Sequence, residues 1–416
     1  MEEITQPSNM NRAYKKVKAN RGSAGVDDMN VDELLPWIRQ HKESLIDSLL
    51  TGDYRPHPVR GVEIPKPGKN RGVRQLGIPT VVDRLVQQAI QQVLEPILDP
   101  TFSESSYGFR PGRSAAQALQ KAREYVSAGY ETVVDLDLEK FFDKVNHDVL
   151  MSRLAKRIKD KRLLKIVRRF LEADIMKEGT RIKRREGMPQ GGPLSPLMSN
   201  LLLDELDKEL EHRGHKFCRY ADDANIYVRS ERAGERVKQS VTAFIWKRLK
   251  LKVNEDKSAS ASVEERQFLG YRLLRGGKLV IAQRSLNTLK DKVRKITTRN
   301  RAMRLDQVIR ELNVALQGWV SYFRLTQWPG VFTDLDAWIR RKLRCYRLKQ
   351  RKTCRSIVKF LVALGNNRRD AWKVAKSGKG WWRLSIAPPV QYAMNNAWFD
   401  KQGLISLRKK STLLNV

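Results

Sequence analysis

Two adjacent acidic residues, Asp222 and Asp223, stand between two short runs that are rich in Phe, Tyr, Ile and Val. Such runs predict a β-hairpin over residues 216–228 with the two carboxylates at its tip. Adjacent carboxylates repel each other unless a positive charge lies between them, and a divalent metal ion commonly supplies that charge. Because the chain as a whole carries a net charge of +35, we expect an enzyme that joins or cuts nucleic acid.

A third carboxylate comes from residues 132–143, whose first part predicts a strand. Alternation along a strand places Asp135 and Asp137 on one face, so periodicity leaves both open as the catalytic residue. The predicted end of the strand favours Asp137, because reactive groups collect where strands give way to loops. With Asp222 and Asp223 it would hold two Mg²⁺ ions about 3.5–4 Å apart, with Mn²⁺ as a substitute. One ion would activate a primer 3′-hydroxyl, and the other would stabilise the leaving pyrophosphate.

Length and composition limit the other possibilities. A chain of 416 residues with 41% hydrophobic residues predicts two to four domains. The charge and a pI near 10.3 indicate a polyanionic partner, either DNA or RNA. The three cysteines are too far apart for a zinc module and odd in number for a disulfide framework, so we expect reduced thiols. The first residues lack a targeting pattern and no apolar run reaches membrane-spanning length, which predicts a cytoplasmic protein without a membrane partner.

The last third of the chain is the most basic part. Residues 283–416 contain 30 Lys and Arg against 7 Asp and Glu, and seven of the nine tryptophans. Apolar spacing predicts helices over residues 305–323 and 335–346. We expect Arg340, Arg341 and Arg344, on one face of the second helix, to line a groove for phosphates. For most of the tryptophans we favour core packing over stacking on bases.

Two helix starts are also predicted in the middle of the chain. Thr80 and Asp83 form a potential capping box that opens a helix with an apolar stripe as far as Ile97. Ser195 and Pro196 resemble a cap and a first helical position, and that helix would end near Leu210.

Five motifs in this order resemble those of reverse transcriptases. Apart from the YADD sequence at residues 220–223, they are DLEKFF at 137–142, MPQGGPLSP at 188–196, KVNEDKS at 252–258 and FLGY at 268–271. Further runs are similar to bacterial group II intron-encoded proteins: YRP at 54–56, IPKP at 64–67, RQLGIPT at 74–80, SYGFRPG at 106–112, NHD at 146–148, and GWVSYFR at 318–324. The chain resembles the compact, group IIC-like type without an endonuclease domain.

This resemblance implies an α+β right-hand polymerase in three parts. These are an N-terminal extension over residues 1–55, fingers and palm over 56–275, and a helical thumb or maturase-specific domain over 276–416. The implied metal ligands are Asp137, Asp222, Asp223 and the backbone carbonyl of Leu138. Asp223 would lie near the primer terminus.

Further residue roles follow from the same motifs. Lys66 and Arg74 would bind triphosphate oxygens, with Lys69 and Arg71 as competitors, while Gln190 and Gly191 would contact the nucleotide or template. Phe142 would exclude a ribose 2′-hydroxyl, unless it is only a core aromatic like Phe141. Lys257 would approach the primer or the palm acids, and a simple salt bridge would explain it equally well. Asp135 and Asp143 are expected to be structural, with Asp143 capping the next helix.

The predicted function is that of an RNA-directed DNA polymerase that extends a DNA primer on an RNA template with dNTPs. It would also act as a maturase that binds group II intron RNA and assists splicing and movement into target DNA. In the cell it would associate with the nucleoid or a ribonucleoprotein. The alternatives are a reverse transcriptase of a CRISPR, retron or phage-defence system, and a splicing-only RNA-binding maturase.

Overall fold

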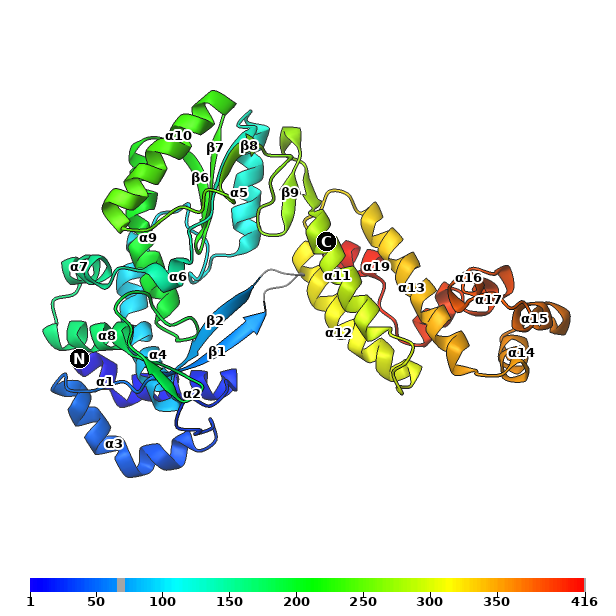
Figure 1. Ribbon diagram of the computed structural model, residues 1–416, viewed down its shortest axis with the longest axis horizontal. Helices are drawn as coiled ribbons and strands as arrows, with labels where there is room; N and C mark the ends of the chain where they lie inside the picture. Colours follow the sequence, from blue (N-terminus) through cyan, green and yellow to red (C-terminus); the bar gives the residue numbers. More distant parts are fainter. Residues whose placement is uncertain (66–71, 415–416) are drawn as a thin grey trace. The chain divides into compact units, whose positions relative to one another are not determined.

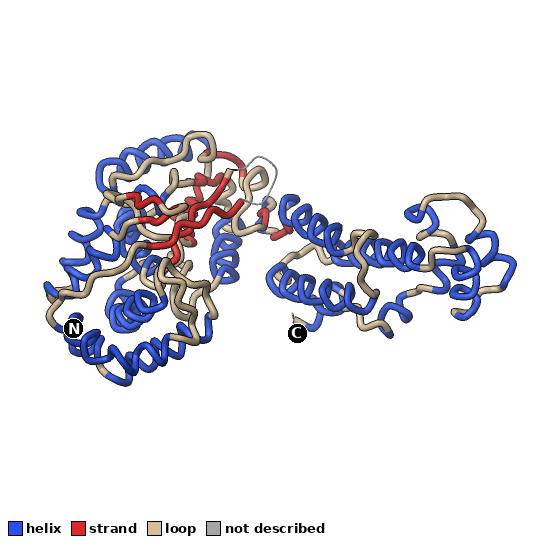
Figure 2. The backbone as a smooth tube through the Cα atoms, turned by 60° about the horizontal axis from the view of Figure 1, so that its bottom comes forward, coloured by secondary structure: helices blue, strands red, loops and turns tan. Residues whose placement is uncertain are grey.

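The computed structural model describes residues 1–65 and 72–414 and divides the chain into two compact units. Unit 1 comprises Met1–Leu269 with Arg275–Gly277, and unit 2 comprises Gly270–Leu274 with Lys278–Val416. Unit 1 mixes helices with two four-stranded sheets, and unit 2 is helical apart from one short hairpin (Figures 1 and 2). The α+β class and the helical C-terminal part are therefore confirmed. The predicted boundaries at residues 55/56 and 275/276 remain predictions.

The first sheet of unit 1 follows three N-terminal helices. The helices are α1 (Glu2–Thr5), α2 (Pro7–Asn20) and α3 (Leu34–Leu50). The sheet has the order β2-β1-β4-β5, with bounds β1 Val59–Pro65, β2 Val73–Ile78, β4 Ile175–Lys177 and β5 Thr180–Ile182. Arg74, one of the basic residues that were predicted to contact a triphosphate, lies on β2. We call this sheet the fingers sheet.

The second sheet, which we call the palm sheet, has the order β6-β7-β3-β8 and is antiparallel throughout. Its strands are β3 Thr132–Leu136, β6 Lys216–Tyr220, β7 Asp223–Val228 and β8 Ala259–Ser262. Alternation turns Ile226 into the main core, while Tyr227 on the other face packs against Tyr125 of α5 (Ala115–Ser127) with ring centroids 5.8 Å apart. Figure 1 shows α10 (Glu231–Phe244) and α5 on opposite sides of this sheet.

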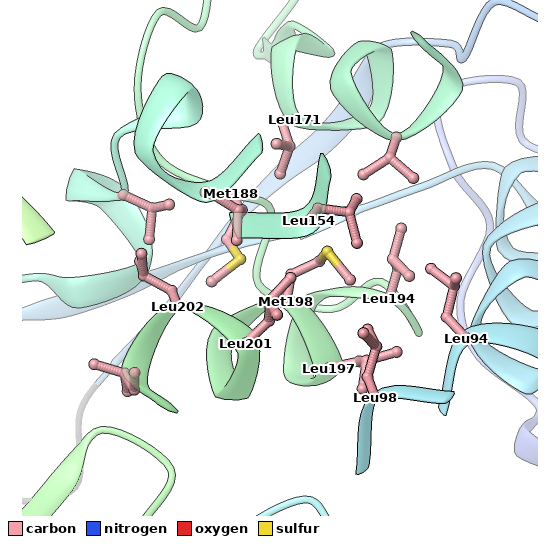
Figure 3. Close-up of a cluster of buried hydrophobic side chains, with 14 of the residues drawn as sticks. Leu94, Leu98, Leu154, Leu171, Met188, Leu194, Leu197, Met198, Leu201 and Leu202 are labelled. Atoms are coloured by element: carbon pink, nitrogen blue, oxygen red, sulfur yellow. The ribbon is translucent and has the colours of Figure 1, made fainter. Parts of the chain in front are cut away.

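The remaining elements of unit 1 are mainly helices that build the core around both sheets. They are α4 Val81–Leu98, η1 Asp99–Thr101, α5 Ala115–Ser127, α6 Phe141–Lys144, α7 His147–Arg157, α8 Lys161–Glu172, α9 Ser195–His212, α10 Glu231–Phe244, η2 Ile245–Leu249 and η3 Arg275–Gly277. Figure 3 shows leucine and methionine side chains from α4, α7, α8 and α9 converging in this core. Burying these apolar side chains packs the helices against the palm sheet, which carries the predicted catalytic carboxylates.

A local start signal was confirmed at α4 but not at two other helices. The Thr80 hydroxyl accepts the Asp83 amide at 3.1 Å, as a cap should. Ser195 is already helical, and its hydroxyl donates to the Pro189 carbonyl at 2.6 Å, so the prediction that it caps α9 is wrong. Asn146, not Asp143, caps α7, because its side chain accepts the Val149 amide. These corrections arise because a nearby loop or a better-placed side chain competes for the same group.

Unit 2 begins with the hairpin β9 (Tyr271–Leu273) and β10 (Leu279–Ile281). Its helices are α11 Gln283–Ile296, α12 Leu305–Phe323, α13 Gly330–Gln350, α14 Cys354–Ala363, α15 Arg368–Ala375, α16 Trp381–Leu384, α17 Pro388–Ala393, α18 Asn396–Lys401 and α19 Leu407–Leu413. The predicted stripe over residues 305–323 matches α12, and the stripe over 335–346 lies within α13. Within the described part of the chain, no helix combines the length and the apolar character that crossing a bilayer requires.

Candidate functional site

The two neighbouring carboxylates lie at the turn of the β6–β7 hairpin, as predicted. Tyr220 pairs with Asp223 at the last rung, and Ala221 between them has a left-handed φ of 58°. On the adjacent strand β3, the last pair of the register is Leu136 with Ala224. One further step along that register brings Asp137 beside Asp223, because antiparallel partners advance in opposite directions. The fold thus gathers the three predicted catalytic carboxylates at one end of the palm sheet.

Asp137 is held by its backbone from the KVNEDKS segment. The Asp137 carbonyl accepts the Asn254 amide at 2.8 Å, and the Asp137 amide donates to the Ser258 hydroxyl at 2.9 Å. On the other side of Leu138, the Glu139 amide donates to Lys252. Leu138 forms an isolated antiparallel bridge with Val253, and the hydrogen bonds of that bridge are made by Asp137 and Glu139. The Leu138 carbonyl therefore points to the opposite side, toward β7. This orientation agrees with its predicted role as a metal ligand.

The structure separates the roles of Asp135 and Asp137. Arg266 donates to the Asp135 carboxylate from two nitrogens, at 3.0 and 2.7 Å, so Asp135 has a fixed counter-charge. Within the described part of the chain, the one cation at ion-pair distance from Asp137 is Lys257, whose ammonium lies 3.5 Å from the carboxylate and is largely exposed. An exposed lysine on a flexible stem is easily displaced, whereas a two-point arginine contact is not. Lys257 therefore lies beside one of the palm acids in a simple salt bridge, and its contact with a primer remains a prediction.

The carboxylates at the hairpin turn are electrostatically strained. Burial raises the pKa of Asp222, and the charge of Asp137 raises it further. Burial and the charges of Asp222, Asp135 and Asp137 raise the pKa of Asp223 to about 7, although solvent reaches part of its side chain. Among the residues that the structure describes, neither has an ion-pair partner. Such a pair gains the most from a multivalent cation.

The donor set suits a divalent metal ion in chemistry but is not arranged as a closed cage. Carboxylate and backbone carbonyl oxygens are the hard ligands that Mg²⁺ prefers, and Arg74 and Lys257 offset only part of the repulsion among the carboxylates. Within residues 1–65 and 72–414, no group of three or more His, Cys, Asp or Glu side chains is already positioned around a common ion. Mg²⁺ usually keeps several waters and shares its remaining sites with substrate phosphates, so an open donor set fits it.

A buried arginine that the sequence analysis missed supports the turn from below. Arg219 is fully buried and donates to Asp207 of α9 at 2.8 Å from Nε and 2.5 Å from Nη2. The same guanidinium reaches Asn200 at 3.0 Å, the hydroxyl of Ser106 at 2.7 Å and the carbonyl of Ala221 at 2.8 Å. It therefore fixes Ala221, the left-handed residue between Tyr220 and the two carboxylates of the turn. Its one sequence signal is a set of charged positions inside the leucine-rich pattern of α9.

Glycine is required where the SYGFRPG loop passes the turn. A Cβ on Gly108 would lie 2.3 Å from the Ala221 amide nitrogen, closer than any real contact. The Gly108 carbonyl accepts the Asn200 side-chain amide at 2.9 Å, which ties this loop to the same network.

The PQG loop connects the palm to the fingers sheet and contacts α6. Its Met188 amide donates to the Phe142 carbonyl at 2.7 Å, and its Gln190 carbonyl accepts the Gly77 amide at 2.9 Å. Gly191 has a φ of 129°, and a Cβ there would lie 2.9 Å from the Gly77 carbonyl oxygen. Phe142, Gln190 and Gly191 therefore lie in one neighbourhood, with Phe142 half-buried and Gly191 exposed.

Among the predicted triphosphate contacts, the structure describes Arg74 only. Arg74 is exposed on β2, and its charge lowers the pKa values of Asp222 and Asp223 against the effect of burial. Its charge therefore acts on both carboxylates of the hairpin turn. Lys66 and its competitors Lys69 and Arg71 lie outside the described residues.

The predicted arginine row of α13 is wrong for Arg344. Its side chain is 8% exposed, and its Nε donates to the Met394 carbonyl at 2.9 Å. Arg340 and Arg341 are half-buried and remain predicted nucleic-acid contacts. The sequence pattern could not reveal this difference, because the residue that covers Arg344 lies fifty positions further along the chain.

Fold and site together define a template-directed nucleic-acid polymerase: an antiparallel palm sheet with clustered carboxylates, a fingers hairpin and a helical second unit. The family of reverse transcriptases (RNA-dependent DNA polymerases) matches residues 64–273, and the maturase-specific domain of group II introns matches residues 286–360. The chain belongs to the reverse transcriptases of the group II intron-encoded type. The predicted family and its RNA-directed DNA polymerase activity are confirmed.

Curated relatives agree with this assignment. Protein YkfC of Escherichia coli is 32% identical over 65% of this chain and 82% of its own length. The group II intron-encoded protein LtrA of Lactococcus lactis is 29% identical over 68% of this chain, and the match spans 60% of LtrA. A solved structure titled "Partial Cas6-RT-Cas1--Cas2 complex" is 30% identical over 58% of this chain and 41% of that chain, with a TM-score of 0.38, which is too low to support an argument.

Proposed function

We propose that the end of the palm sheet is the polymerisation site and that Asp137, Asp222 and Asp223 are its catalytic carboxylates. The observation that carries this proposal is that Asp222 and Asp223 have no ion-pair partner among the described residues. Burial and mutual repulsion raise the pKa values of both carboxyl groups. Unpaired acids that oppose one another cost stability, which a binding-only protein has no reason to bear.

Each residue around this site has a defined task in the proposal. Asp137, Asp222, Asp223 and the Leu138 carbonyl would hold the metal, and Lys257 would leave Asp137 when the metal binds. Two divalent ions, when bound, would activate the attacking 3′-hydroxyl and neutralise charge on the leaving pyrophosphate. Arg74 would orient the triphosphate of the incoming nucleotide through its planar fork.

The nucleotide's sugar and base would face the PQG loop and α6. Phe142 is half-buried and its backbone is hydrogen-bonded to that loop, so its ring has a fixed place from which it can exclude a 2′-hydroxyl. Gln190 and Gly191 lie on the same loop and would contact the nucleotide or the template strand. The proposed substrates are dNTPs and a DNA primer on an RNA template.

The partners of unit 2 follow from its charge and its family match. Residues 283–416 carry a net charge of +23, and the maturase-specific domain lies within them. We propose that unit 2 binds group II intron RNA, whose helices proteins read mainly through shape, backbone and 2′-hydroxyl contacts. Target DNA would be a further ligand. The same domain match favours an intron-associated role over a CRISPR, retron or defence role.

The polymerase site can be tested by primer extension on an RNA template with Mg²⁺ and dNTPs. Asp222→Asn and Asp137→Asn should each slow extension more than about a thousandfold, or about 4 kcal/mol in the barrier. Asp135→Asn is the matched control, because it removes a carboxylate from the same face of β3 that is already paired with Arg266. It should retain extension within about tenfold. Nucleic-acid affinity should be unchanged in all three, and wild-type rates in Asp222→Asn would refute the assignment.

A further inference from the structure

Unit 2 contains a small cavity between α13, α16 and the segment that follows α11. Its volume is about 150 Å³, and its lining residues are Thr297, Arg299, Lys342, Cys345 and Trp382. A cavity of this size holds more than a single water molecule. All of its walls belong to unit 2, so its shape does not depend on the position of unit 1.

Aromatic rings hold the cations around this cavity in place. The Arg341 guanidinium lies 3.8 Å from the ring centre of Trp382 and donates to the Trp382 carbonyl at 3.2 Å. The Lys342 ammonium lies 5.0 Å from the ring centre of Trp382 and 5.7 Å from that of Trp338. Cation–π contacts fix the direction of a charged side chain without neutralising it.

The positive charge at the cavity is uncompensated. Within the described part of the chain, no carboxylate lies at ion-pair distance from Arg299, Arg341 or Lys342, and Arg299 instead contacts the Cys345 sulfur at 3.7 Å. Burial lowers the pKa of Lys342, and the charges of Arg294 and Arg299 lower it further. Arg294 itself is paired with Asp291 at 2.6 Å. Three converging cations without an acid gain free energy when an anion enters.

We propose that this cavity binds one phosphodiester group of a nucleic-acid strand, with the adjoining base or sugar against the ring of Trp382. Arg299 and Lys342 would contact the phosphate oxygens, since a guanidinium fork and an ammonium are the usual phosphate donors of proteins. Trp382 is 38% exposed, which leaves ring surface for stacking. This inference rests on the proposed binding of nucleic acid by unit 2 and places one contact within it.

The test compares two double variants of the full chain. Arg299→Gln with Lys342→Gln removes the two cations that line the cavity. Arg355→Gln with Lys359→Gln is the control, because it removes the same charge from exposed positions of α14 in the same unit. Fluorescence anisotropy with a labelled single-stranded RNA, and with DNA of the same sequence, gives Kd over a salt series. Thermal melts establish that each variant is folded.

The cavity variant should weaken binding roughly tenfold and make the plot of log K against log salt shallower by about 0.7–0.9, the value of one lost phosphate contact. The control should change Kd less than the cavity variant does. Trp382→Leu should weaken binding without changing the slope, because it removes stacking and leaves the charges. A loss for RNA and DNA alike supports a phosphodiester contact that ignores the sugar, and a loss for RNA alone supports one that also reads the 2′-hydroxyl.

Equal losses in the cavity and control variants would overturn the proposal, because net charge alone would then explain them. Unchanged binding in the cavity variant would also overturn it, while wild-type binding would leave the proposed function of unit 2 intact. Absence of RNA and DNA binding in the wild-type chain would overturn both.

Discussion

The buried pair of Arg219 and Asp207 allows a direct test of what holds the turn between β6 and β7 in place. Both side chains are at most 1% exposed, and three nitrogen–oxygen contacts join them. Asp207→Asn keeps the shape of the side chain but removes its charge. The guanidinium of Arg219 is then left buried without a counter-charge, which we expect to destabilise unit 1.

The expected magnitude follows from the geometry. Breaking a buried ion pair at one partner costs about 3–5 kcal/mol. At about 2–4 °C per kcal/mol for domains of roughly 150–250 residues, a size that unit 1 slightly exceeds, this should lower Tm by at most about 6–20 °C. Replacing both partners, with Arg219→Met and Asp207→Leu, removes the unpaired charge. The double variant should therefore be more stable than Asp207→Asn, although Asn200, Ser106 and the Ala221 carbonyl lose the guanidinium that donates hydrogen bonds to them.

Stability and catalysis should separate in this series. In the double variant, the Ala221 carbonyl loses its buried donor, so the turn that presents Asp222 relaxes and primer extension falls although unit 1 stays folded. Circular dichroism melts measure Tm, and hydrogen exchange of peptides from β6 and β7 localises the change. A Tm for Asp207→Asn within about 2 °C of wild type, or a double variant less stable than the single one, would refute the reasoning.

Three further predictions concern sugar choice, pH and the second unit. Phe142→Ala should lower the ratio of kcat/KM for dNTP over NTP, whereas Phe141→Ala should mainly destabilise the core, by about 3–5 kcal/mol; the opposite result would move the gate to Phe141. Because the pKa of Asp223 is raised to about 7, the metal-free fold retains a proton that the unfolded chain loses near pH 4, so its stability should fall as pH rises from about 4 through 7. Melts in EDTA should show this fall, Mg²⁺ should offset it above pH 7, and Asp223→Asn should reduce it. Arg344→Gln should lower the free energy of unfolding by about 1–3 kcal/mol, because the Met394 carbonyl is left without its donor, while the salt dependence of RNA binding stays unchanged. Arg340→Gln should instead make the plot of log K against log salt shallower by about 0.7–0.9.

The features of this protein that the sequence revealed are those whose signal is local or repeats a family motif. The hairpin over residues 216–228, the cap at Thr80 and the helix over residues 305–323 are encoded by near neighbours, through alternation, capping and helical spacing. Motif order then assigned the chain to its family, which the matches over residues 64–273 and 286–360 confirm. Strand alternation also placed Asp135 and Asp137 on one face, but it gave them equal standing.

Only the tertiary structure decided which charged groups are free to act. Arg266, 131 positions away in the sequence, pairs with Asp135. Asp207 and Ser106 accept hydrogen bonds from the buried Arg219. The Met394 carbonyl accepts one from Arg344, so Arg344 does not line the predicted phosphate groove. The physical reason is that backbone propensity depends on residues within a helical turn or a hairpin, and these are close in sequence. The burial and compensation of a charge depend on which distant segments pack around it, and no local pattern records that packing.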